Sequence, residues 1–475
     1  MRSVLKKLAK YVGVVVATML IVVFATIPLA RMEMPDDLLA AENSQALAMD
    51  NVHLITMKDD EVLMDRQVLV RNGLIEDIRA AGSTIGSEYR RIDGGGSYLL
   101  PGLFDMHVHA MDRKYLALSL AYGVTSVRNM GGYPMHLRWK RELEEGQWLG
   151  SNLFTATPTM NGEKNANPLG DQVVTDPDKA RQLVRKYHEM GYDFIKAYAR
   201  LEVDVYKAII NEAGKLDFPV AGHVPYPVVE ADYRLAAPMV TLEHTEDIYQ
   251  GPLGYQYDDE AVAAIADELK DMNATITPTL MIFDHLTRIA RDKQAYLDTL
   301  PLDYLNPAMK LFTDKTSGAR WLNADDNLLA SLEKRNDYFQ YITRILNDTG
   351  VNLVLGTDWG AIYALPGMAT HEEIALLEKA GLPPIDILRM GTINSARILR
   401  SADRYGSIEI GKVADLVVTR DNPLDALATL SEPYAVVKRG QWLDQDALEQ
   451  LKRSAKHPSS TYLTMGRILE FVLLK

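Results

Sequence analysis

The sequence predicts an α/β protein built on a single (β/α)8 barrel (a TIM barrel), with a small β-sandwich domain assembled from both ends of the chain. Three observations support this prediction. The chain has 475 residues, which is enough for a barrel of about 250 to 350 residues plus an accessory domain. Short strand-like runs occur near both ends of the chain. Between them, strands alternate with helical stretches, as in parallel βα units.

The first element is an apolar run over residues 11–30 that contains no charged side chain. Four basic residues precede it: Arg2, Lys6, Lys7 and Lys10. At about 1.5 Å per helical residue, the run reaches roughly 30 Å, the thickness of a bilayer core. Residues 1–31 are therefore expected to be an uncleaved membrane anchor or a removed signal peptide. The rest of the chain would then be exported to the periplasm, and an uncleaved segment would tether it to the inner membrane.

The small β-sandwich domain is expected to combine residues 48–100 with residues 400–445. Both parts contain short strand-like segments separated by turn residues such as Asp-Asp and Asn-Gly. These segments cover residues 53–57, 67–71, 74–79, 407–410, 414–419 and 435–438.

Residues 101–399 are expected to form the barrel. Apolar runs that predict its strands include residues 104–107, 125–128, 193–198, 219–222, 239–243, 275–279 and 352–357. A helix is predicted over residues 177–190, with Asp176 as its cap and Gly191 as its end. Residues 285–346 have helical periodicity and are expected to be an insertion that covers the pocket. Residues 446–475 are expected to form a helical tail.

The composition limits the classes of partner. The formal net charge is −13, and an acidic protein is a poor partner for nucleic acid, whose phosphates select basic surfaces. The chain has no cysteine, so it forms neither disulfides nor thiolate metal sites, which fits an oxidising compartment. Any metal ligands must therefore be histidine, carboxylate or a modified lysine.

Side chains that can bind a divalent cation end several predicted barrel strands. The first strand carries His107-Val-His109, and strand alternation places both imidazoles on the same side. His223, His244 and Asp358 each follow a later apolar run. Any of them alone is typical of a structural residue. Their succession at strand ends, where catalytic groups collect in such barrels, predicts a common metal site.

Lys196 lies on an otherwise apolar predicted strand, on the same face as Phe194 and Tyr198. One interpretation is a lysine whose ammonium reaches solvent or pairs with an acid. The other is that burial and nearby cations favour the neutral amine. A neutral amine can add carbon dioxide to form a carbamate, which would bridge two ions.

Together these motifs resemble the amidohydrolase superfamily over residues 48–445. The matching strings are Pro-Gly-Leu-Phe-Asp-Met-His-Val-His, Gly-Val-Thr-Ser-Val-Arg-Asn-Met-Gly-Gly, Asp-Phe-Ile-Lys-Ala-Tyr, Gly-Thr-Asp and Gly-Ser-Ile-Glu-Ile-Gly-Lys-Val-Ala-Asp-Leu. Within the superfamily, the chain looks most similar to the imidazolonepropionase-like and Xaa-Pro dipeptidase-like (prolidase-like) branch.

The resemblance implies two divalent ions, with zinc as the metal. Carried over by motif, His107, His109 and Asp358 would hold the more buried ion, and His223 and His244 the more exposed one. Carbamylated Lys196 would bridge the two. A hydroxide shared by the ions would attack the substrate carbonyl, and Asp358 would carry its proton to the leaving nitrogen.

Four further residues are candidates for contacts around this site. Tyr226 would hydrogen-bond the oxyanion or a substrate carboxylate, or would simply pack as a loop aromatic. Arg128 and Glu243 are candidates to hold the metal ligands from behind. His371 would do the same or, as we favour, would lie at a helix start.

Dipeptidase-like relatives often carry a glycine- and histidine-rich loop after the third strand. The corresponding residues here, 158–168, contain no histidine. Recognition of a dipeptide carboxylate by that loop is therefore in question, and Lys164 is a candidate to replace it electrostatically.

The sequence thus predicts an exported, metal-dependent hydrolase of C–N amide bonds, acting on a dipeptide such as Xaa-Pro or on an N-acyl amino acid. A cyclic amide of the imidazolone or lactam type is the alternative substrate. Two other interpretations stay open: a non-catalytic scaffold with this fold, and a single ion beside unmodified Lys196, as in deaminase-like relatives. The helical tail would dock on the barrel, on a second copy in a homo-oligomer, or on a membrane surface.

Overall fold

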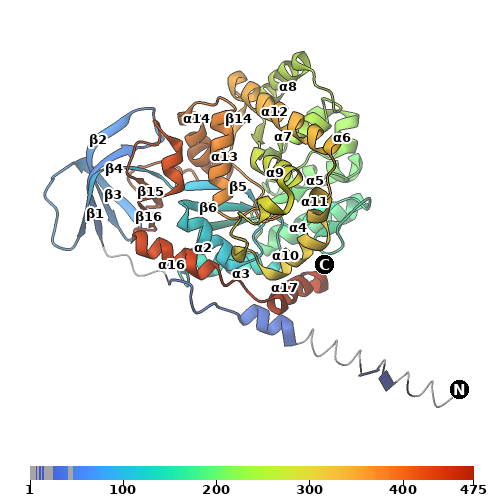
Figure 1. Cartoon of the computed structure of the whole chain (residues 1–475), viewed down its shortest axis with the longest axis horizontal. Helices are drawn as coiled ribbons and strands as arrows, with labels where there is room; N and C mark the ends of the chain where they lie inside the picture. Colours follow the sequence, from blue (N-terminus) through green and yellow to red (C-terminus); the bar gives the residue numbers. More distant parts are fainter. Residues whose placement is uncertain (1–6, 8–9, 12, 15–24, 41–45, 475) are drawn as a thin grey trace.

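The computed structural model describes residues 7, 10–11, 13–14, 25–40 and 46–474. Most of the predicted export segment therefore lies outside the described residues. Among the residues that are described, no helix combines the length and the apolarity needed to cross a bilayer. A β-sheet domain lies at one side of the molecule and a larger β/α domain at the other (Figure 1).

The sheet domain is built from both ends of the chain. It contains β1 (Leu47–Ile55), β2 (Val62–Arg71), β3 (Leu74–Ala80), β4 (Arg90–Pro101), β15 (Leu416–Thr419), β16 (Ala435–Lys438) and β17 (Gln441–Leu443). Their order is β17-β16-β15-β4-β1-β2-β3. Neighbouring strands are antiparallel except β1 and β4, which are parallel.

The predicted β-sandwich is a single continuous hydrogen-bonded sheet. The strand predicted over residues 407–410 is wrong, because these residues form the irregular segment that leads into β15. Its register is interrupted within β1, against both β2 and β4, and such irregularities bend a sheet. Leu74 of β3 forms a bridge with Val413, just before β15. The edge strand β3 therefore folds back towards β15, which lies near the middle of the sheet. The sheet thereby encloses its own apolar cluster, which includes Met49, Val68 and Val437.

The β/α domain contains eight parallel barrel strands. They are β5 (Leu103–Val108), β6 (Val124–Asn129), β7 (Asn152–Thr155), β10 (Ile195–Ala197), β11 (Val220–Gly222), β12 (Thr241–Glu243), β13 (Thr275–Thr277) and β14 (Asn352–Leu353). A bridge between Ala156 and Phe194 joins β7 to β10, and a bridge between Val108 and Trp359 joins β5 to the segment after β14. These bridges close the barrel. Two short strands, β8 (Thr159–Asn161) and β9 (Asp171–Val173), extend the sheet beside β10.

Helices surround the strands (Figure 1). They are α2 (Arg113–Ala121), α3 (Pro134–Glu144), α4 (Pro177–Met190), α5 (Val203–Lys215), α6 (Tyr226–Ala231), α7 (Thr245–Gln250), α8 (Asp259–Asp271), α13 (Met368–Lys379), α14 (Pro384–Arg389) and α15 (Ser395–Ile398). Short turns of helix cover Tyr233–Ala236, Leu302–Tyr304, Met390–Asn394 and Leu427–Ser431. In α4 the cap is Asp176, and the helix ends at Gly191 with a φ of 87°, as the sequence predicts.

The segment predicted as a helical insertion forms four helices. They are α9 (Leu280–Leu297), α10 (Pro307–Lys315), α11 (Ser317–Leu322) and α12 (Asp326–Thr349). The first of them begins directly after the strand end near Thr279, because the carboxylate of Glu373 accepts hydrogen bonds from the first backbone N–H groups of α9.

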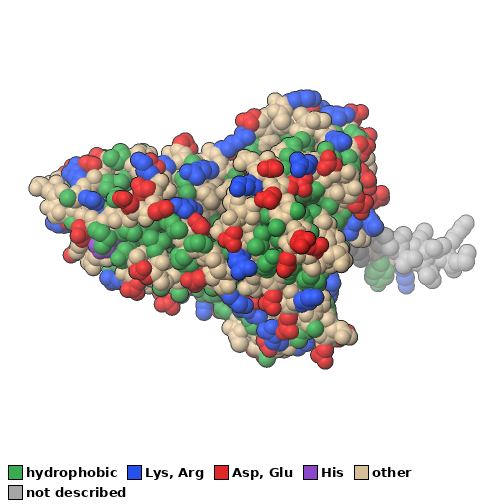
Figure 2. Space-filling view, turned by 90° about the horizontal axis from the view of Figure 1, so that it is seen from above, with side chains coloured by type: hydrophobic (Ala, Val, Ile, Leu, Met, Phe, Trp, Pro, Cys, Tyr) green, Lys and Arg blue, Asp and Glu red, His purple; other side chains and the backbone are tan. Residues whose placement is uncertain are grey.

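The tail forms α16 (Gln445–Ala455), which packs on α2, and α17 (Thr461–Leu474), which packs on α3 and α10. Arg138 of α3 and Glu470 of α17 form an ion pair at 2.7 Å. Gly466 faces Thr26 and Ala30 so closely that a Cβ there would lie 2.7 Å from Thr26 and 2.9 Å from Ala30. The segment around Thr26 and Ala30 therefore packs on α17. Acidic and basic side chains are interspersed over the face shown in Figure 2.

Gly222 ends β11 immediately before His223. Its φ is +137°, and a Cβ at this position would lie 2.1 Å from the carbonyl oxygen of Ala197. The ends of β10 and β11 can approach this closely only because Gly222 has no side chain. This close approach fixes the separation between Lys196 and His223.

We expect Gly222→Ala to lower the free energy of unfolding by about 1–3 kcal/mol, because backbone has to move. The measurement is chemical denaturation of the purified protein. The matched control is Gly214→Ala in the exposed part of α5, where an added Cβ meets nothing within 4 Å. It should be neutral or stabilising. Equal effects of the two substitutions would contradict this account of Gly222.

Candidate metal centre

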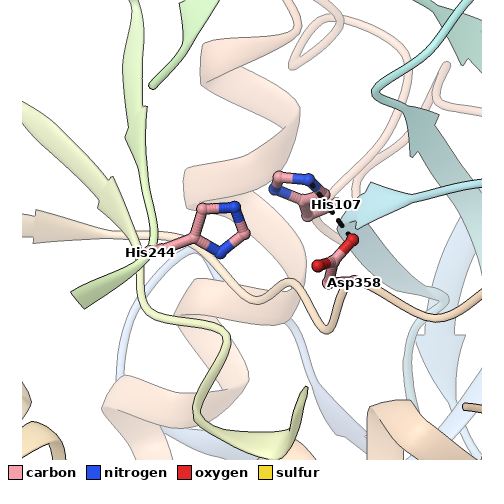
Figure 3. Close-up of side chains that lie close together, drawn as sticks. All are labelled: His107, His244 and Asp358. Carbon is pink, nitrogen blue, oxygen red and sulfur yellow. Dashed lines mark ion pairs between the residues drawn. The ribbon is translucent and has the colours of Figure 1, made fainter. Parts of the chain in front are cut away.

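Three predicted ligands meet at the carboxyl ends of the barrel strands. One ligand atom from each of His107, His244 and Asp358 lies within 4.8 Å of the others, and Figure 3 shows the three side chains around a common space. His107 lies in β5, His244 directly follows β12, and Asp358 lies five residues after β14. These last two residues have φ values of 68° and 65°. Such strained backbone is typical of functional sites.

The four predicted histidines form a continuous series. Ring centroids are 5.5 Å apart for His109 and His107, 4.6 Å for His107 and His244, and 4.6 Å for His244 and His223. All four line one cavity of about 320 Å³, together with Lys196 and Asp358. The structure thus brings the six predicted ligands to one place.

Three of these rings are held from behind through Nδ1. His107 Nδ1 lies 2.9 Å from Glu243 Oε2, His223 Nδ1 lies 2.9 Å from Asp247 Oδ2, and His244 Nδ1 lies 2.7 Å from Thr279 Oγ1. Each bond leaves Nε2 as the free ring nitrogen of its histidine. A second partner of this kind fixes the ring orientation of histidines that bind metal ions.

Glu243 is itself held by Arg128. The Nη2 of Arg128 donates to Glu243 Oε1 at 2.7 Å, and its Nη1 donates to Thr241 Oγ1 at 2.7 Å. Arg128 also donates from Nε to the carbonyl oxygen of Met106 at 2.5 Å. Burial would raise the pKa of Glu243, but the charge of Arg128 keeps it below its usual value. Glu243 therefore stays ionised and faces His107 as an acceptor.

Asp358 has an oxygen that fits a metal ligand. Its Oδ1 is buried and accepts no hydrogen bond of good geometry from the described residues, although His109 Nε2 lies 2.9 Å away and His107 Nε2 lies 3.6 Å away. The Nε2 atoms of His107 and His109 and the Oδ1 of Asp358 therefore point towards one space without forming well-aligned hydrogen bonds with one another. Burial opposes ionisation of Asp358, but the neighbouring histidines outweigh it and hold its pKa below the usual range.

Lys196 is buried in β10 beside these groups. Its Nζ forms no ion pair with any described carboxylate and lies 5.9 Å from the centre of the Tyr198 ring. Burial lowers its pKa to about 8. An unpaired, buried lysine with a lowered pKa favours the neutral-amine interpretation over a lysine paired with an acid.

These donors fit a pair of borderline divalent ions. Imidazole nitrogens with oriented rings, a buried carboxylate oxygen and a lysine able to become a carbamate are ligands that zinc accepts. Such a site needs no thiolate ligand, and the chain has no cysteine to supply one.

The remaining predicted residues lie further away. The hydroxyl of Tyr226 donates to Gln250 Oε1 at 2.8 Å, and Tyr226 lines a neighbouring cavity that also includes His223. Lys164 is exposed in the loop between β8 and β9, and Asn165 and Asn167 of the same loop reach the metal-site cavity. His371 lies in the first turn of α13, and its Nε2 donates to the carbonyl oxygen of Tyr122 at the end of α2 at 2.8 Å, so it joins these two helices.

Three supporting residues were not predicted from the sequence. Asp247 and Thr279 bond His223 and His244, as described above. Asp105 is buried, and its carboxylate accepts hydrogen bonds from the backbone N–H groups of His107 and Thr357, so it ties the ends of two strands together. Burial raises the pKa of Asp105 to about 7. The sequence signal for this role of Asp105 is its place at the end of Pro-Gly-Leu-Phe-Asp, two residues before His107.

A comparison with known protein families gives a match over most of the chain. Residues 98–443 match the amidohydrolase family. The chain therefore belongs to the amidohydrolase family, and the resemblance seen in its motifs is confirmed.

Similar proteins have been described among curated sequences and solved structures. Adenine deaminase of Chelativorans sp. (strain BNC1) is 29% identical over 222 residues, which cover 42% of this chain and 36% of that protein. The chain thus matches about a third of that relative. The bottromycin amidohydrolase structure has a TM-score of 0.72 at 23% identity, covering 91% of this chain and 93% of that one. A Xaa-Pro dipeptidase with bound methionine has a TM-score of 0.65 at 19% identity, covering 84% and 100%. At these identities the two structures show a shared fold.

We expect Asp247→Asn to weaken one of two metal sites by about 10–100-fold, because the ring of His223 loses the carboxylate that holds its Nδ1. Metal per chain, measured by elemental mass spectrometry after dialysis, should fall from two towards one. Glu246→Gln is the matched control, because the hydrogen bonds of the His223 ring go to Asp247 and not to the neighbouring Glu246. Two tightly held ions in Asp247→Asn would contradict this role.

We also expect metal-free protein to take up carbon dioxide at Lys196 in a pH-dependent manner. With a pKa of about 8, the neutral amine rises from about 3% at pH 6.5 to about 75% at pH 8.5. At a fixed concentration of dissolved ¹³CO₂, the carbamate signal in ¹³C NMR should therefore grow over this range. Lys196→Arg should abolish the signal, and a signal that persists would assign it to another amine.

Proposed function

We propose that this protein is a two-metal hydrolase that cleaves the C–N amide bond of a peptide-like or N-acyl amino-acid substrate. One observation supports this most strongly. Six residues from five barrel βα units line one cavity. Their metal-binding atoms point into it, and the Oδ1 of Asp358 accepts no well-aligned hydrogen bond from the described residues. Family membership supports the same reaction class.

Zinc is the proposed metal, held by His107, His109 and Asp358 on one side and by His223 and His244 on the other. A carbamate on Lys196 would complete both sets. Bound there, two such ions supply an acidified water and polarise the substrate carbonyl.

The chain itself supplies positioning and proton transfer. Asp358 is ionised and buried at the centre of the site, so it is placed to accept the proton of the attacking water and to deliver it to the leaving nitrogen. The reaction consumes one water molecule. Its hydroxyl joins the carbonyl carbon, the C–N bond breaks, and the nitrogen leaves with the water's remaining proton. Glu243, Asp247 and Thr279 keep the ligand rings in place during these steps.

We expect hydrolysis to be lost on chelation and restored by zinc with bicarbonate. Asp358→Asn should lower kcat by about 10²–10⁴-fold, because no group then carries the proton. The measurement is product release from a library of dipeptides and N-acyl amino acids with the full chain in detergent. Asp267→Asn, at an exposed position of α8, is the control and should have full activity. A protein with neither stoichiometric metal nor hydrolysis would be a scaffold instead.

A further inference from the structure

Two side cavities adjoin the metal-site cavity at opposite ends of the histidine series. One shares Tyr198 and His223 with it and measures about 360 Å³. The other shares His109 and Tyr133 with it and measures about 320 Å³. An amide has one arm on each side of the bond to be cut. Each cavity is therefore the place for one arm of the substrate.

The chemistry of the two cavities differs. Beside His109, the walls include Met111, Leu169, Met309 and Phe312, and no lysine or arginine lines this cavity. This side fits an apolar group. Beside His223, the walls include two arginines from the helical insertion, Arg320 of α11 and Arg335 of α12.

Neither arginine has an anionic partner among the described residues. Arg335 is half-buried and donates from Nε to the carbonyl oxygen of Ser331 at 3.3 Å, and the guanidinium of Arg320 lies over the Trp321 ring at 4.7 Å. By contrast, Arg288 and Arg291 on nearby α9 both form ion pairs, with Asp284 and Glu333. Unpaired guanidinium groups at a cavity wall are suited to bind a carboxylate through two hydrogen bonds.

The acids in this cavity do not neutralise the two arginines. Asp247 is engaged by the His223 ring at 2.9 Å. Glu246 also lines the cavity, but among the described residues no ion pair joins it to Arg320 or Arg335. Both guanidinium groups therefore stay available to an anionic ligand in this cavity.

On the basis of the proposed function, we propose that Arg335 and Arg320 bind a free carboxylate on the arm of the substrate beside His223. The substrate is then an N-acyl amino acid or a dipeptide with a free carboxyl end, and its apolar arm lies beside His109. This role does not need Lys164, which is exposed in another loop.

The test compares matched acids and amides: the N-acetyl derivatives of leucine, phenylalanine and proline, each as the free acid and as the primary amide. Affinity is measured by isothermal titration calorimetry on zinc-loaded full chain, and KM and kcat are measured for each compound that is hydrolysed. We expect the acid to be favoured over its amide by about 10–100-fold, mainly through affinity and KM. Arg335→Gln and Arg320→Gln should each reduce this preference by about tenfold or more.

Lys334→Gln is the control, because Lys334 precedes Arg335 on the same helix, is exposed and does not line the cavity. It should keep the preference for acids. All three variants change partly or fully exposed side chains, and thermal denaturation checks that they fold.

The outcomes separate this proposal from the proposed function. Hydrolysis with no preference for acids, or with a preference that survives both arginine substitutions, would overturn the carboxylate site and leave the hydrolase intact. Arginine-dependent binding of the acids without any hydrolysis would support the carboxylate site and overturn the hydrolase.

Discussion

The geometry of the whole site depends on the buried ion pair between Arg128 and Glu243. Arg128 comes from β6 and Glu243 from β12, and both are almost fully buried at the centre of the barrel. Through Glu243 the pair fixes the ring of His107, and through Nε of Arg128 it fixes the backbone of β5 at Met106. Removing one partner of such a buried pair lowers the free energy of unfolding by about 3–5 kcal/mol, because the other charge is left unpaired. Three strands are thus held in register by charges that also orient a ligand.

The order of the barrel strands and the place of the six ligands could be predicted because both are properties of local sequence. A strand that ends in a polar residue brings that residue to the carboxyl end of the barrel, wherever the strand lies in the chain. His107, His223 and His244 follow this rule, and Asp358 comes five residues after β14. Lys196 follows it too, since it is the polar exception on an apolar strand.

The supporting contacts could not be predicted in the same way. Asp247 meets His223 because α7 starts immediately after β12, and the contact joins residues 24 positions apart. The loop that contains Lys164 leaves that lysine in solvent and brings two asparagines to the cavity instead. The sheet domain is one folded sheet because irregular pairing bends β1, and alternation of polar and apolar residues does not reveal such bends. Contacts of this kind depend on loop paths and on bulges.

The C-terminal helix α17 joins parts of the molecule that are distant in sequence. Its Ile468 lines the apolar cavity beside His109, and its Arg467 forms an ion pair with Glu33. Helix α17 is therefore a wall of the cavity beside His109 and also the packing partner of the segment around Glu33. Shortening the chain at its end would open that cavity to water, and the placement of an affinity tag matters for the same reason.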